Sequence, residues 1–379
     1  MQVWDFIFWV SLSLIFWTYA GYYLLLKLLG FAAERTIKRA EIEPAVSLII
    51  TAHNEERRLA EKLDNTLALD YPKEKLEIII VSDASTDRTD EIVRSYAESG
   101  VTLLVMEQRG GKHFAQGRGI AAANHDIVVC SDATTFLAPD AVRMMVRNFA
   151  DPTVGCVSGE DRVKTADVDS AGEGAYVRYE MNLRHLESRA GSLVGVSGCF
   201  FSVRKELCST WYDNMSSDFY VAILTCMRGY RVVAEREAIG SYEVLRDPGR
   251  EFTRKVRTVV HGMEVLFHLA GILNPFRYGF YSLQMISHKL VRWLVPFCLI
   301  GVALSSVLLS SSHPVYIVAL VGQGALYLMA VLAHLLPGLG RLSLFKIPLF
   351  FLMANMSIMV AWYRYLTGQK YVVWDSTKR

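Results

Sequence analysis

Long apolar runs lie at both ends of this 379-residue chain, and the charged residues crowd between about residues 34 and 260. The first run, Phe6–Leu26, is long enough to cross the roughly 30 Å hydrocarbon core of a bilayer. No basic segment precedes it and no small-residue cleavage site follows it, so an uncleaved anchor is predicted rather than a signal peptide. Lys27 and Arg35 follow the run, and by the positive-inside rule they put the next segment in the cytoplasm.

Three more apolar runs, at about 290–310, 315–336 and 346–366, predict a C-terminal membrane bundle. Three spans that start in the cytosol would leave the tail, residues 368–379, outside the cell, although this tail is basic. The pattern leaves open whether one segment is re-entrant or interfacial, or whether the tail is an exception to the positive-inside rule. Ahead of the bundle, about 250–285 mixes basic and apolar residues, which predicts helices in the headgroup plane with their apolar side toward the lipid. The alternative is the solvated basic face of an ordinary helix.

The central region alternates short apolar runs with polar stretches of helical length. Ala45–Thr51, Leu76–Val81, Val101–Val105 and Ile127–Val129 are rich in β-branched residues and predict buried strands. Asn54 is expected to cap the helix that follows the first strand. Strands and helices in this order build βαβ units, and therefore a parallel sheet with helices on both faces.

Two of the predicted strands run into an aspartate, Asp83 after the second strand and Asp132 after the fourth. The carboxyl ends of parallel strands are where open α/β sheets bind ligands. An aspartate at a strand end also caps turns, and this structural role is the alternative for both residues.

The composition of the chain indicates its cellular compartment and the class of partner it can bind. Hydrophobic residues make up 52% of the chain and its mean hydropathy is +0.25, which is too apolar for an ordinary soluble enzyme. A net charge of +2 gives no basic field that would favour nucleic acid. The six cysteines have no CxxC or Cys/His metal spacing, so buried free thiols in a reducing compartment are expected.

Seven segments of the central region follow one another in this order: VSLIITAHNEE, IIIVSDASTDRT, RGGKHFAQGRGIAAA, IVVCSDATT, VSGCFFSVRKEL, SSDFYVAILTCMRGYRVV and EFTRKVRTVVHG. They cover roughly residues 45–262 and resemble family 2 glycosyltransferases with the GT-A fold. The flanking apolar runs resemble the membrane-bound branch of that family, which includes cellulose, hyaluronan and poly-N-acetylglucosamine synthases. The resemblance implies an α/β, Rossmann-like, nucleotide-sugar-binding GT-A domain in the cytosol with flanking transmembrane helices.

On this basis the chain is expected to divide into five parts. These are a transmembrane anchor (1–30), a GT-A domain (44–248), amphipathic interfacial helices (249–285), a transmembrane bundle (286–367) and a basic tail (368–379). The expected location is a bacterial inner or plasma membrane, with the catalytic domain in the cytoplasm.

The resemblance also implies roles for residues on the donor side. Thr51, Ala52 and Glu55 match positions that hold the nucleoside. Asp83 matches the carboxylate that hydrogen-bonds the base, and an N–H donor on the base suits a buried acceptor. Lys112 matches a glycine-lysine element near the nucleotide, with a solvated surface lysine as the alternative.

Asp132 matches the first aspartate of the DxD motif, whose partner is a Mg²⁺ or Mn²⁺ ion on the sugar-nucleotide diphosphate. The motif here reads Asp132-Ala133-Thr134, so the second carboxylate is absent and the metal is expected on Asp132, the diphosphate and waters. The family often has an asparagine five residues after the lysine. Gly117 stands there in this chain, which predicts the loss of one polar contact.

On the acceptor side, Asp218 matches the family's catalytic base, an acid at the start of a helix that accepts the proton of the attacking hydroxyl. An N-cap role is the structural alternative, and both roles are compatible. The position before it, often acidic in relatives, is Ser217. Ser197, Gly198 and Cys199 match the segment that lines the acceptor side, although packing of a glycine turn explains Cys199 nearly as well.

Arg257 matches the arginine of the QxxRW element and is expected to hold the diphosphate through paired N–H donors. Arg254 and Thr258 replace the glutamine and the tryptophan of that element. The missing aromatic ring removes a stacking platform for an acceptor sugar and disfavours processive extension. His261 is interpreted as a surface histidine, with a metal or phosphate contact as the alternative.

The leading hypothesis is an inverting transferase that moves a sugar from a nucleotide-diphosphate sugar, most simply UDP-linked, to a lipid-linked or growing glycan acceptor at the inner membrane face. A processive synthase that exports its polymer is the first alternative. A non-catalytic membrane assembly protein that binds sugar nucleotides is the second. The expected partners are the donor, the acceptor and membrane lipids, with no nucleic acid, and the oligomeric state stays open.

Overall fold

The computed structural model describes residues 2–32, 35–163, 171–242, 248–336, 338–339 and 342–369. The strands are β1 Val46–Ala52, β2 Leu76–Ser82, β3 Val101–Val105, β4 Ile127–Asp132, β5 Phe136–Leu137, β6 Val154–Val163, β7 Phe200–Arg204 and β8 Arg231–Tyr242. The helices are α1 Gln2–Phe16, α2 Tyr22–Ala32, α3 Leu59–Leu67, α4 Thr89–Ser95, α5 Lys112–Ala122, α6 Ala141–Val146, α7 Ala171–Ala190, α8 Ser217–Met227, α9 Pro248–His268, α10 Pro275–Tyr278, α11 Phe280–Met285, α12 Val291–Leu308, α13 Pro314–Leu335 and α14 Ser343–Leu366.

Within the described residues, eight strands form one sheet in the order β3-β2-β1-β4-β7-β6-β8-β5. The first four are parallel to one another, whereas β7 runs antiparallel to both of its neighbours. β1 is buried along its whole length, which explains its continuous apolar sequence, because a strand covered on both faces needs no polar alternation. The predicted α/β architecture is confirmed, and the four strands predicted from the sequence form the parallel part of the sheet.

Two hydrophobic clusters cover the two faces of this sheet. On one face, Ile49 and Val128 pack with residues of α5, α8 and α9. On the other face, Leu48 and Val129 pack with residues of α3, α4 and α6. Successive strand residues thus enter opposite layers, as the two-residue period of a strand requires.

All four predicted strands are present, with ends that differ by at most a few residues. The expected helix cap at Asn54 is wrong, because α3 begins only at Leu59. Asn54 instead adopts a left-handed backbone conformation with φ of 54°, which asparagine tolerates, and its Oδ1 accepts a hydrogen bond from Thr86 N at 2.8 Å. The residue therefore ties the loop after β1 to the loop after β2.

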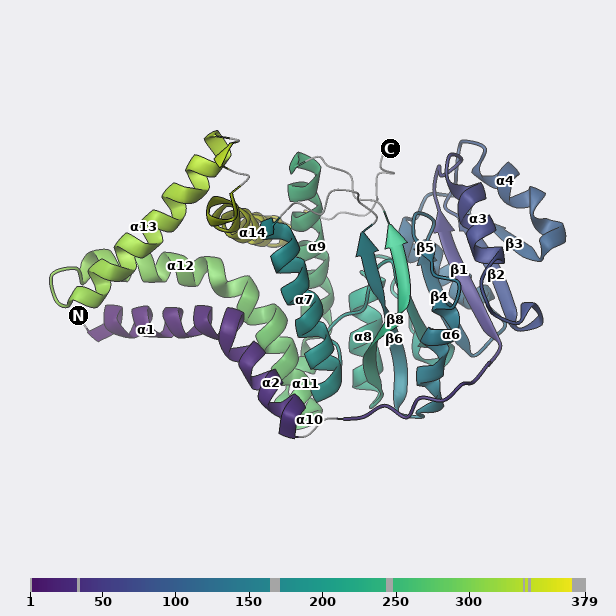
Figure 1. Cartoon of the computed structure of the whole chain (residues 1–379), viewed down its shortest axis with the longest axis horizontal. Helices are drawn as coiled ribbons and strands as arrows, with labels where there is room; N and C mark the ends of the chain where they lie inside the picture. The colour runs from purple at the N-terminus through teal and green to yellow at the C-terminus, as the bar shows by residue number, and fades with distance from the viewer. Residues whose placement is uncertain are drawn as a thin grey trace.

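Four described segments are long and apolar enough to cross a membrane: Gln2–Phe31, Phe280–Leu308, Pro314–Leu335 and Ser343–Leu366. They correspond to the predicted anchor and to the three predicted C-terminal runs. Figure 1 shows α1, α12 and α13 extending away from the sheet at one end of the molecule. Many of their large apolar side chains, such as Phe6, Val318 and Val321, are exposed in the isolated chain, as expected of helices that contact lipid.

Two of these segments contain a π-helical turn, η1 at Trp17–Gly21 and η7 at Ile286–Leu290. The turns lie against each other, and Trp17 Nε1 donates a hydrogen bond to Ser287 Oγ at 3.0 Å. Beyond them, α1 packs along α12 on the membrane side, and α2 packs on α7 beside the sheet domain. These two segments therefore pass from the bundle to the sheet domain through one wide turn each.

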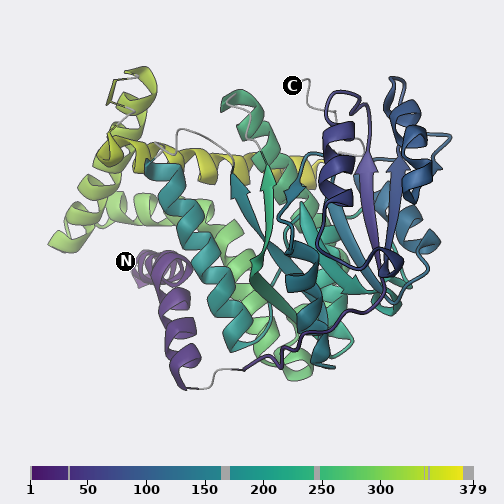
Figure 2. The same ribbon diagram turned by 45° about the vertical axis from the view of Figure 1, so that its right-hand side comes forward.

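The apolar side of α9 packs on protein, although the sequence predicted that it would face lipid, and the placement of residues 249–285 in the headgroup plane stays a prediction. Val256 and Val260, which are 1% and 0% exposed, pack on Ala361 of α14. Further along the helix, Met263 and Leu266 enter the core of the sheet domain. Figure 1 and Figure 2 both show α7 and α9 standing between the sheet and the membrane helices. The basic and apolar pattern arises because α9 is covered by protein on its apolar side.

Candidate active site

The three carboxylates singled out by the sequence lie around one short segment, Gly110–His113, at the start of α5. Asp83, which follows β2, is 4% exposed, and its two carboxylate oxygens accept hydrogen bonds from the N–H groups of Gly110 and Gly111, each at 2.8 Å. Gly111 has a φ of 88°, a conformation that favours glycine. Asp83 thus holds the entrance to α5, and its contact with a base stays a prediction.

Lys112 joins this segment to Asp132. Its Nζ atom lies 2.5 Å from Asp132 Oδ1 and donates a second hydrogen bond to the carbonyl oxygen of Gly198 at 2.7 Å. Burial alone would lower the pKa of Lys112, but the negative charge of Asp132, with a smaller contribution from Asp218, outweighs it and raises the pKa to about 12. The alternative of a solvated surface lysine is therefore wrong.

The other predicted nucleoside contacts surround Asp83 at the same edge of the sheet. Thr51 pairs with Asp132 in the strand register, and the carbonyl oxygen of Ala52 accepts a hydrogen bond from Asp83 N at 2.9 Å. Glu55 N donates to Thr89 Oγ1 at 2.9 Å. The ends of β1, β2 and β4 thus form one continuous edge, as parallel strands in adjacent positions require.

Asp132 is the only carboxylate of its motif, because Ala133 and Thr134 follow it. Within the described ranges, no three histidine, cysteine or carboxylate side chains converge on one point. A cation caged entirely by protein does not fit this arrangement. A Mg²⁺ or Mn²⁺ ion held by Asp132 together with phosphate oxygens and waters does fit it, because these ions keep several non-protein oxygen ligands.

The predicted acceptor segment closes the other side of the site. Ser197 Oγ donates a hydrogen bond to Asp161 Oδ1 at 2.6 Å and accepts one from Cys199 N at 3.1 Å. A Cβ atom added to Gly198 would lie 3.4 Å from Asp218 Oδ2, an ordinary van der Waals distance, so the backbone of Gly198 passes close to that carboxylate. Asp161 was not predicted, and burial raises the pKa of its carboxyl group.

Asp218 is the second residue of α8, and its Oδ1 accepts a hydrogen bond from the hydroxyl of Ser216. The ring of His261, on α9, lies 6.2 Å from the ring of His113, centroid to centroid. Burial, followed by the charge of Arg257, lowers the pKa of His261 to about 4. His261 is therefore part of the site and not a surface histidine, and Arg257 stands one helical turn before it.

Comparison with known proteins agrees with this geometry. Residues 47–211 match the family described as glycosyl transferase family 2. The chain carries a glycosyl transferase family 2 domain. Poly-beta-1,6-N-acetyl-D-glucosamine synthase of Staphylococcus aureus is 29% identical over 258 residues, and the match spans 66% of this chain but only 62% of that protein. The synthase of Staphylococcus epidermidis is 27% identical over 278 residues, 70% of this chain and 67% of its own length.

Among solved structures, the mannosyltransferase PcManGT from Pyrobaculum calidifontis, in complex with GDP-Man and Mn²⁺, resembles the whole chain. The TM-score is 0.73 at 22% sequence identity, over 96% of this chain and 100% of that one. This likeness establishes the fold, a GT-A sheet domain with membrane-type helices at both ends.

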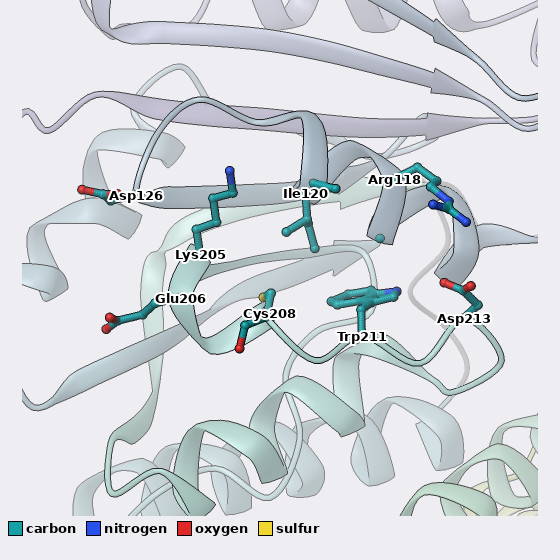
Figure 3. A pocket seen from close by; sticks show the side chains of 11 residues that line it. Arg118, Ile120, Asp126, Lys205, Glu206, Cys208, Trp211 and Asp213 are labelled. Atoms are coloured by element: carbon teal, nitrogen blue, oxygen red, sulfur yellow. The ribbon is translucent and has the colours of Figure 1, made fainter.

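Gly117 of the family 2 domain allows an aromatic side chain to reach α5. A Cβ atom at this position would lie 2.4 Å from Trp211 Cδ1, and the Trp211 Nε1 atom donates a hydrogen bond to the carbonyl oxygen of His113 at 2.9 Å. Trp211 also lines a cavity of about 680 Å³ beside α5, together with Arg118 and Asp126 (Figure 3). The polar contact that an asparagine would make at residue 117 is absent, as predicted, and Trp211 from a distant loop packs there instead.

A buried lysine beneath the DxD strand of the family 2 domain was also missed. Lys62, on α3, is 0% exposed, and its Nζ atom donates to Ser131 Oγ at 2.9 Å and to the carbonyl oxygen of Thr135. The sequence could have predicted this burial. Lys62 and Leu63 follow Leu59 by three and four residues, and these spacings put all three side chains on the apolar side of the helix.

Proposed function

We propose that this protein is an inverting glycosyltransferase that transfers a sugar from a nucleotide-diphosphate sugar to a lipid-linked or growing glycan acceptor at the inner membrane face. The observation that carries the proposal is the meeting of Asp132, Lys112 and Asp218 around Gly198, between a nucleotide-type sheet edge and membrane helices. The family 2 match and the names of the curated relatives support the reaction class.

In this proposal Asp218 removes the proton of the acceptor hydroxyl while that oxygen attacks C1 of the donor sugar. The bond from C1 to the diphosphate oxygen breaks in the same step, so the anomeric configuration inverts once. Lys112 and Arg257 stabilise the charge of the departing nucleoside diphosphate through N–H donors. A Mg²⁺ or Mn²⁺ ion, when bound at Asp132, would supply Lewis-acid stabilisation of the diphosphate.

Addition of few sugars is favoured over long processive synthesis. Thr258, in place of an aromatic residue, is exposed, and its hydroxyl donates to the carbonyl oxygen of Arg254 in its own helix. It therefore offers no ring on which an acceptor sugar can stack. The similarity to polymer synthases over about two thirds of this chain supports the processive alternative. Product length distinguishes the two candidates.

The proposal is tested with detergent-purified protein, Mn²⁺, labelled UDP- and GDP-sugars and a membrane-lipid extract as acceptor. We expect transfer from one donor, with a product of inverted anomeric configuration by NMR. Asp218→Asn should lower transfer by a factor of roughly 100 to 10,000 while donor affinity stays unchanged. Asp213→Asn, at the cavity of Figure 3, is the matched control. Normal donor binding without transfer or hydrolysis would favour the non-catalytic assembly protein.

A further inference from the structure

We propose that His113 is the positioning residue that holds Asp218 at a fixed place relative to Asp132, by capping helix α8 with its Nδ1 atom. Ser217 N, the first N–H group of α8, donates a hydrogen bond to His113 Nδ1 at 3.1 Å. The inference rests on the proposed function, in which Asp218 is the base.

The contacts around Ser217 assign the hydrogen-bonding role of the imidazole. Ser217 Oγ donates its proton to Gln116 Oε1 at 2.5 Å and lies 3.0 Å from His113 Nδ1. An imidazole nitrogen that accepts an N–H group carries no proton, so the proton of the neutral ring is on Nε2. Burial, only partly opposed by the charge of Asp218, lowers the pKa of His113 to about 3, which keeps the ring neutral.

Helix α8 needs this cap because its own N-cap residue is engaged elsewhere. The first N–H groups of a helix have no partner within the helix. Ser216 is the N-cap residue, but its side chain makes no capping bond and donates instead to Asp218 Oδ1. The acceptor for the first turn of α8 therefore comes from α5, a helix 100 residues earlier in the chain.

The same turn of α5 also holds the other chemical group of the site. Lys112, the residue before His113, pairs with Asp132 at 2.5 Å, so two consecutive side chains contact the metal-side strand and the base-side helix. The carbonyl group of His113 is held in turn by Trp211 Nε1 at 2.9 Å. The first turn of α5 therefore sets the separation of Asp132 and Asp218, and that separation governs turnover more than donor binding.

Two variants of His113 separate capping from simple packing. His113→Asn keeps an acceptor at the position of Nδ1, whereas His113→Leu keeps the branched shape and removes the acceptor. His113→Leu should lower kcat by roughly 10- to 100-fold with donor affinity unchanged, because a misplaced catalytic group loses about that much. His113→Asn should stay within about threefold of the native kcat because the cap is retained. The same two substitutions at His125, just before β4 at the opposite end of the sheet, should leave kcat unchanged.

The melting temperature and the donor dissociation constant are measured for every variant, so that a folding defect is recognised. Equal losses of kcat in the Asn and Leu variants would overturn the capping role, as would a native kcat in the Leu variant. If the Leu variant does not fold, the kcat of His113→Asn against that of His113→Ser, which is too short to cap, decides the question. In each case Asp218→Asn is measured as the reference. An active native enzyme and an inactive Asp218→Asn variant support the proposed function whatever the His113 variants do. A failure of this inference is therefore distinguishable from a failure of the proposed function.

Discussion

The donor half of the sheet domain, β1 to β4, and the acceptor half, β6 to β8 with α8 and α9, build their parts of the site in different ways. In the donor half, Asp83 and Asp132 each stand at the end of their own strand and lie along the same sheet edge because β1 pairs with both β2 and β4. In the acceptor half, Asp218 lies in the first turn of a helix whose first N–H group is bound by a side chain of α5, and the backbone of Gly198, before β7, passes close to its carboxylate.

The donor side of the site depends on strand order, whereas the acceptor side depends on contacts between segments that are distant in the sequence. The order of the strands places the two donor-side aspartates along one edge of the sheet. The acceptor side is assembled from side-chain contacts between distant segments, such as His113 with Ser217 and Trp211 with Gly117. Substitutions in the donor half should therefore affect donor binding and turnover together, and those at acceptor-half contacts should affect turnover alone.

Within the donor half, the largest effect is expected at Asp132. Asp132→Asn removes the charge on which the cation depends, and it should lower transfer by roughly a hundredfold or more, because a bound cation supplies several kcal/mol of charge stabilisation. Manganese-dependent donor binding, measured by calorimetry, should fall with it. Asp126→Asn, at the opposite end of β4, is the control. Full donor affinity in Asp132→Asn would contradict the assignment of the cation.

Lys112 contacts both halves, through Asp132 and the carbonyl oxygen of Gly198. Lys112→Met keeps the length of the side chain and removes its charge. Donor affinity should fall by about 10- to 100-fold, since a hydrogen bond to a charged group contributes about 1.5–3 kcal/mol. Lys205→Met, whose Nζ atom donates to Ala123 O at 2.5 Å, should bind the donor normally. Unchanged affinity in the Lys112 variant would place the diphosphate elsewhere.

The contact between α5 and the loop before α8 is tested by Gly117→Ala. The new methyl group would meet Trp211, and such overpacking costs about 1–3 kcal/mol of folding stability. We expect a lower melting temperature and a lower kcat with an unchanged donor dissociation constant. The double variant with Trp211→Leu should be no less stable than Trp211→Leu alone. Additive losses would show that the two residues are not in contact.

The smallest effect is expected from the buried Lys62. Burial lowers its pKa to about 7, against the opposing charge of Asp132, whereas an unfolded lysine titrates near 10.4. Between about pH 7 and 10 the unfolded chain therefore binds more protons, so stability should rise with pH, by at most about 1.4 kcal/mol per pH unit. Lys62→Met should flatten this rise in apparent melting temperature, and Lys205→Met should not. If the apparent melting temperature of the Lys62 variant rose with pH as steeply as that of the native protein, Lys62 would not be the source of the pH dependence.

The sequence predicts the donor half well because its signals are local. Short β-branched runs become strands, and a carboxylate after such a run lies at the carboxyl edge whatever the rest of the fold does. Asn54 was misinterpreted because a cap and a left-handed loop residue use the same short polar side chain. Lys62 was predictable from its spacing on the apolar face of α3, but a lysine on such a face is normally expected to reach solvent through its long side chain.

The acceptor side could be predicted only as separate pieces. Asp218 and Gly198 were singled out, but no periodicity links His113 to Ser217 or Gly117 to Trp211, because each pair joins segments about 100 residues apart. The apolar side of α9 was assigned to lipid because hydrocarbon and the side chains of α14 are equally apolar covers. Only tertiary structure distinguishes them.

The paired π turns determine how α1 is rotated about its own axis relative to the neighbouring helices of the bundle. Each of them holds one residue more per turn than an α-helix, and Trp17 is locked to Ser287 between them. Removing one residue from the turn Trp17–Gly21 would let α1 continue as a plain α-helix, but rotated by about 100° about its axis. The hydrogen bond from the Tyr316 hydroxyl to Asp5, near the other end of α1, would then point the wrong way. A single inserted residue therefore determines which side of the first membrane helix meets its neighbours and which side meets the lipid.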